Sequence, residues 1–351
     1  MRILLIGPHF LGKWTESSRA ALQALGHHVY TVYYAQSPNE FRIMRAMAMT
    51  AVWSQAHRGA IHAALSKLWL SRRHRSLNNI ARDFSPQLII VLKGETIPLN
   101  VLGGLRCHLK VPIVTWWVDD PFRFPDIVET YSLYDRFFIF DRAYIPRLED
   151  LGVRRLTFLP CACDIHDYRK MNLSGANRRR YACDVAFAGA FYSQRGRLVT
   201  SMAGLDVAVW GVGWQLPEAK PALQAVGRTA LRGKKLEAQQ AARLYNVAKI
   251  CVNKHHGQSV YNGLNLRSFE VLACGGFQLV DRLPGMHELL APGKEVICYE
   301  SYDQARELAD YYLARPEARV EIGRNGRVRV LKEHTYRHRM KKMLMAVNDL
   351  L

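Results

Sequence analysis

Short apolar runs alternate with helix-like stretches along this chain, and this alternation narrows the choice of fold more than any other feature. Residues 3–6 are typical of a buried strand, residues 17–25 of a helix that ends at Gly26, and residues 28–33 of a second strand. A strand, a helix and a strand in this order build a parallel sheet that helices cover. The sequence therefore predicts an α/β fold.

Polar residues follow the next strands of this predicted sheet, at 88–92, 113–117 and 136–140. Ligands of open parallel sheets bind at the carboxyl ends of the strands. Asp119 and Asp120 follow the strand at 113–117, where repulsion between adjacent acids could raise the pKa of one of them toward that of a general base. The structural alternative is a helix cap followed by a turn.

A second series of strands and helices begins near residue 181, with a strand that ends at Gly189. Another predicted strand ends before Gly211, where the missing side chain lets a backbone or a ligand approach closely. The chain has 351 residues, of which 49% are hydrophobic, and this is enough for two domains with separate cores. We therefore expect two sheets rather than one.

The segment at 261–276 carries the clearest chemical signal, because a polar glycine turn runs into a short apolar helix that stops at paired glycines. Arg267 and Glu270 lie in the first turns of this helix, and a helix start attracts anions. A guanidinium fork matches phosphate oxygens, and a carboxylate can accept both hydroxyls of a ribose. The alternative is an ordinary capped helix that buries its apolar face and leaves Glu270 in solvent.

The segment resembles the donor-binding signature of the retaining GT-B glycosyltransferases, most closely the CgeB-like (spore-maturation-type) branch. The pattern of that branch is Asn-x-Arg-x-Phe-Glu-x-x-Ala-x-Gly. It is matched here by Asn265, Arg267, Phe269, Glu270, Ala273 and Gly275. The wider superfamily carries a second glutamate, on the side of the transferred sugar, where this chain has Asn262 followed by the expected Gly263.

The resemblance implies two doubly wound, Rossmann-like domains that face each other across a cleft. We expect an acceptor-side domain at 1–170, a linker at 171–180 and a nucleotide-sugar donor domain at 181–334. A C-terminal helix at 335–351 is expected to cross back to the first domain.

The resemblance also implies a glycosyltransferase that moves a sugar from a nucleotide diphosphate sugar, with a UDP-sugar favoured, to a protein, polysaccharide or lipid-linked acceptor. No metal ion or other cofactor is expected, because arginines would neutralise the leaving diphosphate. Two alternatives stay open. One is a nucleotide-sugar epimerase of the same fold, and the other is a non-catalytic scaffold that binds a nucleotide or a glycan, which the amide at Asn262 leaves open.

The site residues follow from the same resemblance. Glu270 would bind the ribose, and Arg267, with Arg195 and Lys254, the diphosphate. The full set of expected donor contacts is Gly189, Arg195, Gly211, Lys254, Asn262, Gly263, Asn265, Arg267 and Glu270. On the acceptor side the catalytic candidates are Asp119, Asp120 and His9, although an ordinary strand-end histidine also explains His9.

The net charge is +19, from 49 Lys and Arg against 30 Asp and Glu, and such a field favours acidic partners. The segment at 41–82 interleaves basic with apolar residues, as basic amphipathic helices do. Such helices can lie on an anionic membrane, or they can pack on their own domain with a solvated basic side. Nucleic acid is a less favoured partner, because no reading module accompanies the charge.

Neither the cysteines nor the N-terminus points to export or to a metal centre. The 7 cysteines are scattered without the paired spacing of a zinc site. The apolar run at 1–7 is too short for a signal peptide, and no run approaches the roughly 20 apolar residues that span a bilayer. We expect a cytoplasmic protein that is at most peripheral at the inner face of the membrane.

Overall fold

The computed structural model describes residues 1–9, 13–34, 76–227 and 229–351. These residues form two compact units, one of Met1–Leu159 with Tyr336–Leu351 and one of Pro160–Thr335. Each unit contains a six-stranded sheet in which every strand pair is parallel. The predicted α/β fold with two doubly wound sheets is confirmed.

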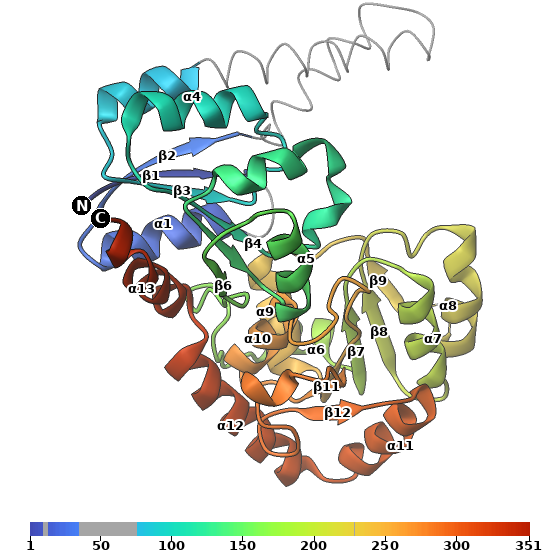
Figure 1. The fold of residues 1–351 in the computed structure, drawn as a ribbon. Helices are drawn as coiled ribbons and strands as arrows, with labels where there is room; N and C mark the ends of the chain where they lie inside the picture. The colour runs from blue at the N-terminus through green and yellow to red at the C-terminus, as the bar shows by residue number, and fades with distance from the viewer. Residues whose placement is uncertain (10–12, 35–75, 228) are drawn as a thin grey trace, which may run out of the picture. The chain divides into compact units, whose positions relative to one another are not determined.

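The first sheet has the strand order β2-β1-β3-β4-β5-β6. The chain moves from β1 to one neighbour, β2, and then returns to place β3 on the other side. Helix α4 covers one face of this sheet, and α1 with α13 covers the other (Figure 1). The strands are β1 Arg2–Gly7, β2 His28–Tyr33, β3 Leu88–Leu92, β4 Ile113–Trp117, β5 Arg136–Ile139 and β6 Leu156–Phe158. The helices are α1 Trp14–Ala24, α4 Leu99–Leu109, η1 Pro121–Arg123, η2 Pro125–Leu133, η3 Arg142–Tyr144, α5 Ile145–Asp150, α13 Tyr336–Ala346 and η6 Asn348–Leu350.

Trp116 of β4 explains why the C-terminal helix packs on the first unit. Its ring lies edge-on to Trp14 of α1, with 5.3 Å between ring centroids, and 6.3 Å from the ring of Tyr336 at the start of α13. Its Nε1 donates to the carbonyl oxygen of Leu159 at 2.9 Å. A fully buried indole of this size contributes a large apolar area and still satisfies its N–H group.

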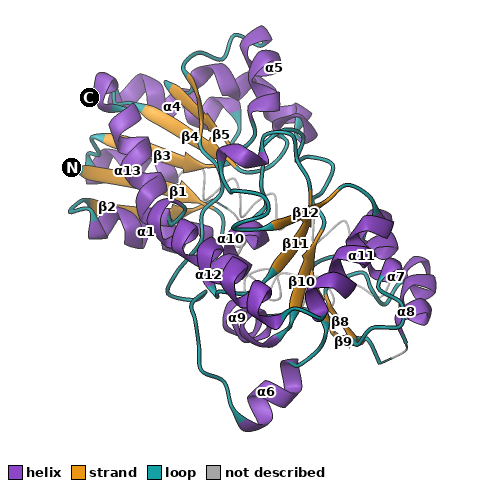
Figure 2. Cartoon of the chain, turned by 90° about the horizontal axis from the view of Figure 1, so that it is seen from below, coloured by secondary structure: helices purple, strands orange, loops and turns teal. Residues whose placement is uncertain are grey.

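The second sheet has the strand order β12-β11-β10-β7-β8-β9. Figure 2 shows α9 and α10 on one side of it and α7, α8 and α11 on the other. The strands are β7 Val185–Ala188, β8 Val207–Trp210, β9 Leu231–Gly233, β10 Ile250–Asn253, β11 Gln278–Asp281 and β12 Ile297–Tyr299. The helices are α6 Gly175–Tyr181, α7 Ser193–Ser201, η4 Pro217–Ala219, α8 Lys220–Val226, α9 Ala238–Val247, α10 Leu266–Ala273, η5 Met286–Glu288, α11 Tyr302–Leu313 and α12 Pro316–Glu333.

Both faces of the second sheet are apolar, which is why its strands are short continuous hydrophobic runs. One core cluster joins β7, β8 and β10 to α7 and α11 through residues such as Val185, Val209 and Leu198. A second cluster joins the opposite face to α9 and α10 through Leu244 and Val271. The sheet is thereby fixed between two helix layers, which leaves the ends of its strands as the usual place for a ligand.

Most of the basic segment at 41–82 lies outside the described residues, which resume at residue 76 with a helix over 76–84. The prediction of a membrane-facing helix there is therefore not tested. Among the residues that the structure describes, no helix combines the length and the apolar character needed to cross a bilayer.

Candidate functional site

The topological switch point of the second sheet gathers most of the predicted donor residues. Strand β7 has β8 on one side and β10 on the other, so successive connections leave it in opposite directions. Ligands of doubly wound sheets bind at such a point, outside the carboxyl ends of the strands. These ends are Gly189, directly after β7, and Asn253, the last residue of β10.

Helix α10 begins beside this point, where the sequence predicts a helix start. Its N-cap is Asn265, whose side-chain oxygen accepts from the backbone N–H of Ser268 at 3.1 Å. The side-chain nitrogen Nδ2 of Asn265 donates to Asn253 Oδ1 at 3.1 Å, and Asn253 Nδ2 donates to Asn265 Oδ1 at 3.1 Å. Asn265 therefore acts first as a helix cap that is tied to the end of β10.

Arg267 extends from the first turn of α10 toward both strand ends. Its Nη1 donates to Asn253 Oδ1 at 2.7 Å. Its Nη2 lies where a side chain on Gly189 would point, 2.5 Å from the position of a Cβ at that glycine. Within the described residues, its buried Nε has no hydrogen-bond partner. The absence of a side chain at Gly189 thus leaves room for this guanidinium in its present position.

Arg195, in the first turn of α7, is the second guanidinium at the switch point. It is buried, its Nε donates to the carbonyl oxygen of Lys254 at 3.2 Å, and its Nη1 donates to that of Ala190 at 3.0 Å. Burial, together with the positive charge of Arg267, lowers the pKa of Arg195 to about 10. A buried cation and the half-buried one beside it, which repel each other, make a site that an anion would stabilise.

Glu270 lies one turn after Arg267 and is partly buried. Burial raises the pKa of Glu270 to about 7, although Arg267 and a hydrogen bond with Tyr168 act in the opposite direction. The ring of Tyr168 stacks on that of Tyr245, with centroids 6.2 Å apart. The carboxyl group of Glu270 is therefore about half ionised near pH 7.

The structure gives Lys254 a partner that the sequence analysis did not predict. Its Nζ lies 2.9 Å from Asp281 Oδ2, at the end of β11. Asp281 Oδ1 accepts from the backbone N–H and from Nδ1 of His255, at 2.8 and 2.9 Å. Burial raises the pKa of Asp281, but His255 and Lys254 outweigh it and lower this pKa to about 2.

Three predicted donor residues have roles within the fold. Asn262 is fully buried, and its amide donates to Glu288 Oε2 at 3.0 Å, while its neighbour Gly263 is buried in the same loop. Gly211 lies against Gly189, since a Cβ at Gly211 would stand 1.8 Å from the Gly189 carbonyl oxygen. The same oxygen accepts from Trp214 Nε1 at 2.8 Å.

In the first unit, the predicted acids lie at the carboxyl end of β4. Asp119 Oδ2 is 2.6 Å from the buried ammonium of Lys93. Asp120 accepts from the backbone N–H of Phe122 at 2.9 Å and so caps η1, as the structural alternative predicts. His9 is exposed and stacks on the ring of Tyr33, with centroids 4.1 Å apart.

Three polar residues of these strand ends are not among the predicted site residues, namely Lys93, Asn253 and Asp281. Lys93 follows β3 with a left-handed φ of 66°, which is uncommon for a residue other than glycine and marks a backbone held by its surroundings. Each of the three is a polar residue at the end of an apolar strand. That position is the signal by which the sequence could have found them.

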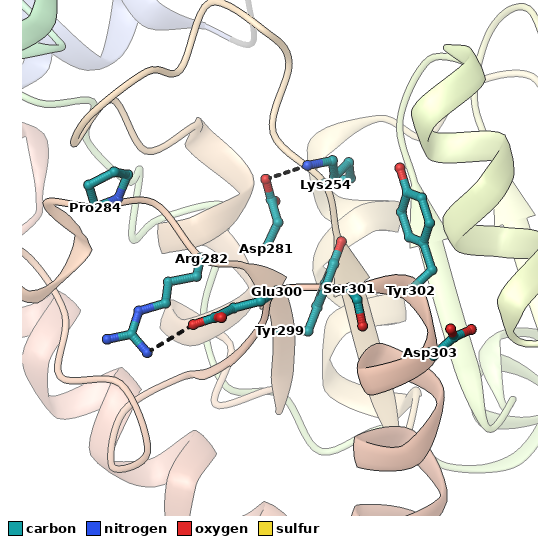
Figure 3. A pocket seen from close by; sticks show the side chains of 9 residues that line it. All are labelled: Lys254, Asp281, Arg282, Pro284, Tyr299, Glu300, Ser301, Tyr302 and Asp303. Carbon is teal, nitrogen blue, oxygen red and sulfur yellow. Dashed lines mark hydrogen bonds and ion pairs between the residues drawn. The ribbon is translucent and has the colours of Figure 1, made fainter.

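A pocket of about 630 Å³ opens beside the switch point, at the carboxyl ends of β10, β11 and β12 (Figure 3). It is lined by Lys254, Asp281, Arg282, Pro284, Tyr299, Glu300, Ser301, Tyr302 and Asp303. Among the described residues, no group of three or more His, Cys, Asp or Glu side chains could hold a metal ion.

Comparisons with known proteins bear on the family and the fold of this chain. Residues 194–345 match the family model described as glycosyl transferase-like. Spore protein CgeB of Bacillus subtilis (strain 168) is 24% identical over 253 residues, which are 67% of this chain and 75% of CgeB.

Solved structures show the same fold over the whole chain. A sucrose-phosphate synthase from Thermosynechococcus elongatus has a TM-score of 0.67 and 16% identity, over 100% of this chain and 99% of its own. HepE from Anabaena, solved in complex with UDP, has a TM-score of 0.68 and 12% identity, over 100% of both chains.

Proposed function

Because this chain is a GT-B glycosyltransferase of the CgeB-like kind, we propose that it moves a sugar from a nucleotide diphosphate sugar to an acceptor without a metal ion. The observation that carries this proposal is the pair of guanidinium groups at the switch point of the second unit, that of Arg195 buried and that of Arg267 half-buried. Arg195 and Arg267 approach each other closely enough for the charge of one to lower the pKa of the other.

The two arginines would bind the diphosphate of the donor. A guanidinium offers a planar fork of N–H donors that matches phosphate oxygens. When the bond between the sugar and the diphosphate breaks, negative charge grows on the leaving phosphate, and fixed cations stabilise it more than they stabilise the intact donor. Arg195 and Arg267 are held in place by backbone and amide oxygens, so little reorganisation is needed.

Glu270 would bind the ribose of the donor. It lies on the same helix as Arg267, one turn further along, and a carboxylate there can accept from both ribose hydroxyls. The base is proposed to be uracil, because HepE, whose fold this chain shares, was solved with UDP and with UDP-glucose.

The first unit would present the acceptor, with Asp119 as the candidate that touches its hydroxyl. The buried ammonium of Lys93 lies 2.6 Å from Asp119 Oδ2 and orients this carboxylate, whose oxygens are hydrogen-bond acceptors. Asp120 caps η1 and is a weaker candidate. The acceptor would be a protein, a polysaccharide or a lipid-linked glycan.

The experiment that tests this function is a binding screen followed by a transfer assay. Thermal shift and calorimetry with UDP, GDP, ADP, TDP and CMP, each with and without a divalent cation, would be run on wild type, Arg267→Ala and Glu270→Ala. The control is Arg324→Ala, which removes an exposed arginine of α12.

We expect one nucleoside diphosphate to stabilise the wild type and the control, with or without metal. We expect it to lose affinity in the other two variants. Stabilisation by no nucleotide would overturn the proposal. Binding of the nucleotide sugar without its cleavage or transfer, over a range of acceptors, would favour a scaffold instead.

A further inference from the structure

The pocket at the ends of β10, β11 and β12 differs in electrostatic character from the arginine site beside it. Lys254 pairs with Asp281 at 2.9 Å, and Arg282 pairs with Glu300 at 3.5 Å. Asp303 adds a third carboxylate to the lining. The pocket therefore holds two cations against three anions, and a diphosphate would gain nothing from entering it.

The lining suits a neutral ligand that carries hydroxyl groups. The ammonium of Lys254 has three N–H donors, of which one meets Asp281, and the carboxylates accept from hydroxyls. Tyr302 adds a half-buried ring with a hydroxyl group, and in Figure 3 its side chain stands on the side of the pocket opposite to the Arg282–Glu300 pair. A sugar ring combines a hydroxyl edge with an apolar face, and this combination matches charged pairs next to an aromatic ring.

The pocket shares its wall with the arginine site. Tyr299, a buried residue of the lining, donates from its hydroxyl to the carbonyl oxygen of Asn253 at 2.9 Å. The carbonyl oxygen of Lys254 accepts from Arg195, while the side chain of Lys254 lines the pocket. Asp281 and Tyr299 also lie near enough to act electrostatically on Arg195. Lys254 thus contacts the arginine site through its backbone and the pocket through its side chain.

We propose that this pocket binds the glycosyl group of the donor, and that Lys254 and Tyr302 contact its hydroxyls. A nucleotide sugar carries its charge on the diphosphate and none on a neutral sugar, and the two neighbouring sites divide these parts between them. This inference rests on the proposed function. In this arrangement Lys254 binds the sugar, whereas the sequence predicts that it binds the diphosphate.

The test compares nucleotide sugars with the nucleotide alone. Calorimetry would measure the affinity of wild type for UDP, UDP-glucose, UDP-galactose and UDP-N-acetylglucosamine. The same ligands would be measured for Lys254→Met, which keeps the aliphatic stem, and for Tyr302→Phe, which keeps the packing of the ring.

Two control variants make the same side-chain changes outside the pocket. Lys249→Met removes a lysine that stands just before the same strand β10, at its other end, and that also forms an ion pair, with Asp184 at 2.7 Å. Tyr311→Phe removes the hydroxyl of an exposed tyrosine on the same helix α11.

We expect wild type and both controls to prefer at least one UDP-sugar over UDP. Lys254→Met and Tyr302→Phe should reduce this preference by about 5- to 10-fold, the effect of one lost hydrogen bond, with UDP affinity within about twofold of wild type. If UDP binds but the variants keep the preference, or wild type has none, the pocket does not hold the sugar. If UDP itself fails to bind, the proposed function has failed first.

Discussion

Arg267 donates from Nη1 to Asn253 Oδ1 at 2.7 Å, and this bond joins the start of α10 to the end of β10. Asn253 is fully buried, and its Nδ2 donates in turn to Asn265 and to Ser268, at 3.1 and 3.2 Å. The amide of one strand-end residue therefore fixes both the cap of the helix and the guanidinium that the helix carries. The second Nη of Arg267 is left facing Gly189.

Replacing this amide by a carboxylate should weaken diphosphate binding. In Asn253→Asp the new charge would pair with Arg267 and compete with the phosphates for the guanidinium. We expect the affinity for UDP to fall by about tenfold or more, with the affinity for uridine nearly unchanged, as measured by calorimetry. Asn172→Asp, which adds the same charge at an exposed position, is the control. An equal loss for UDP and uridine would show that the amide does not act through Arg267.

The close contact between Gly211 and Gly189 leads to a second prediction. A methyl group on Gly211 would stand 1.8 Å from the carbonyl oxygen of Gly189, which is backbone and cannot turn aside. We expect Gly211→Ala to destabilise the second unit by about 1–3 kcal/mol, the usual cost of overpacking, as a lower thermal midpoint. Gly257→Ala is the control, because nothing lies within 4 Å of a Cβ there. Equal midpoints for the two variants would contradict the close contact.

The sequence predicts one half of the candidate site better than the other. Local patterns reveal α10, since its N-cap Asn265, its arginine and its closing glycines lie within a few residues of one another. The partners of Arg267 and Lys254 come from the ends of other strands, Asn253 and Asp281. These strand ends become neighbours only through the order of the strands in the sheet, which the local pattern does not contain.

The same limit applies to polar residues whose sequence context suggests chemistry and whose side chains also have partners within the fold. Asp120 precedes a proline and caps a short helix. Asn262 donates a hydrogen bond to Glu288, which lies after the next strand of the chain, β11. A cap and a ligand contact require the same residue types. Only the hydrogen-bond partner distinguishes the two roles.

Glu270 makes the affinity for nucleotide depend on pH. Its raised pKa, about 7, means that the carboxyl is largely protonated below pH 7, whereas a ribose needs the carboxylate as a double acceptor. The affinity for UDP-glucose should therefore rise by about tenfold between pH 6 and pH 8, because the ionised fraction of Glu270 rises by that factor. Calorimetry in buffers of different ionisation enthalpy should detect a proton released on binding near pH 6.5.

Glu270→Gln gives the matched test of this pH dependence. The amide keeps the shape of the side chain but does not titrate. The variant should therefore bind UDP-glucose, whose diphosphate does not titrate in this range, more weakly than wild type at pH 8, with an affinity that is flat between pH 6 and pH 8. A pH dependence that survives in the variant would assign the titration to another group. An unchanged affinity in a folded Glu270→Gln variant would remove Glu270 from the site.

Asp281 should stabilise the second unit at neutral pH and lose this effect in acid. Its pKa in the folded chain, about 2, lies below the ordinary value of 3.8, so the unfolded chain binds a proton first as the pH falls. The stabilisation is then complete above about pH 5 and disappears between pH 4 and pH 2, and its size is about 2 kcal/mol. Urea unfolding of Asp281→Asn should show a lower midpoint than wild type at pH 7, with the two midpoints converging only near pH 2, at the folded pKa. Asp310→Asn, which breaks an exposed pair with Arg306 at 2.8 Å, should shift the midpoint little at any pH. Equal midpoints for Asp281→Asn and wild type at pH 7 would mean that Lys254 and His255 do not hold this carboxylate in its ionised form.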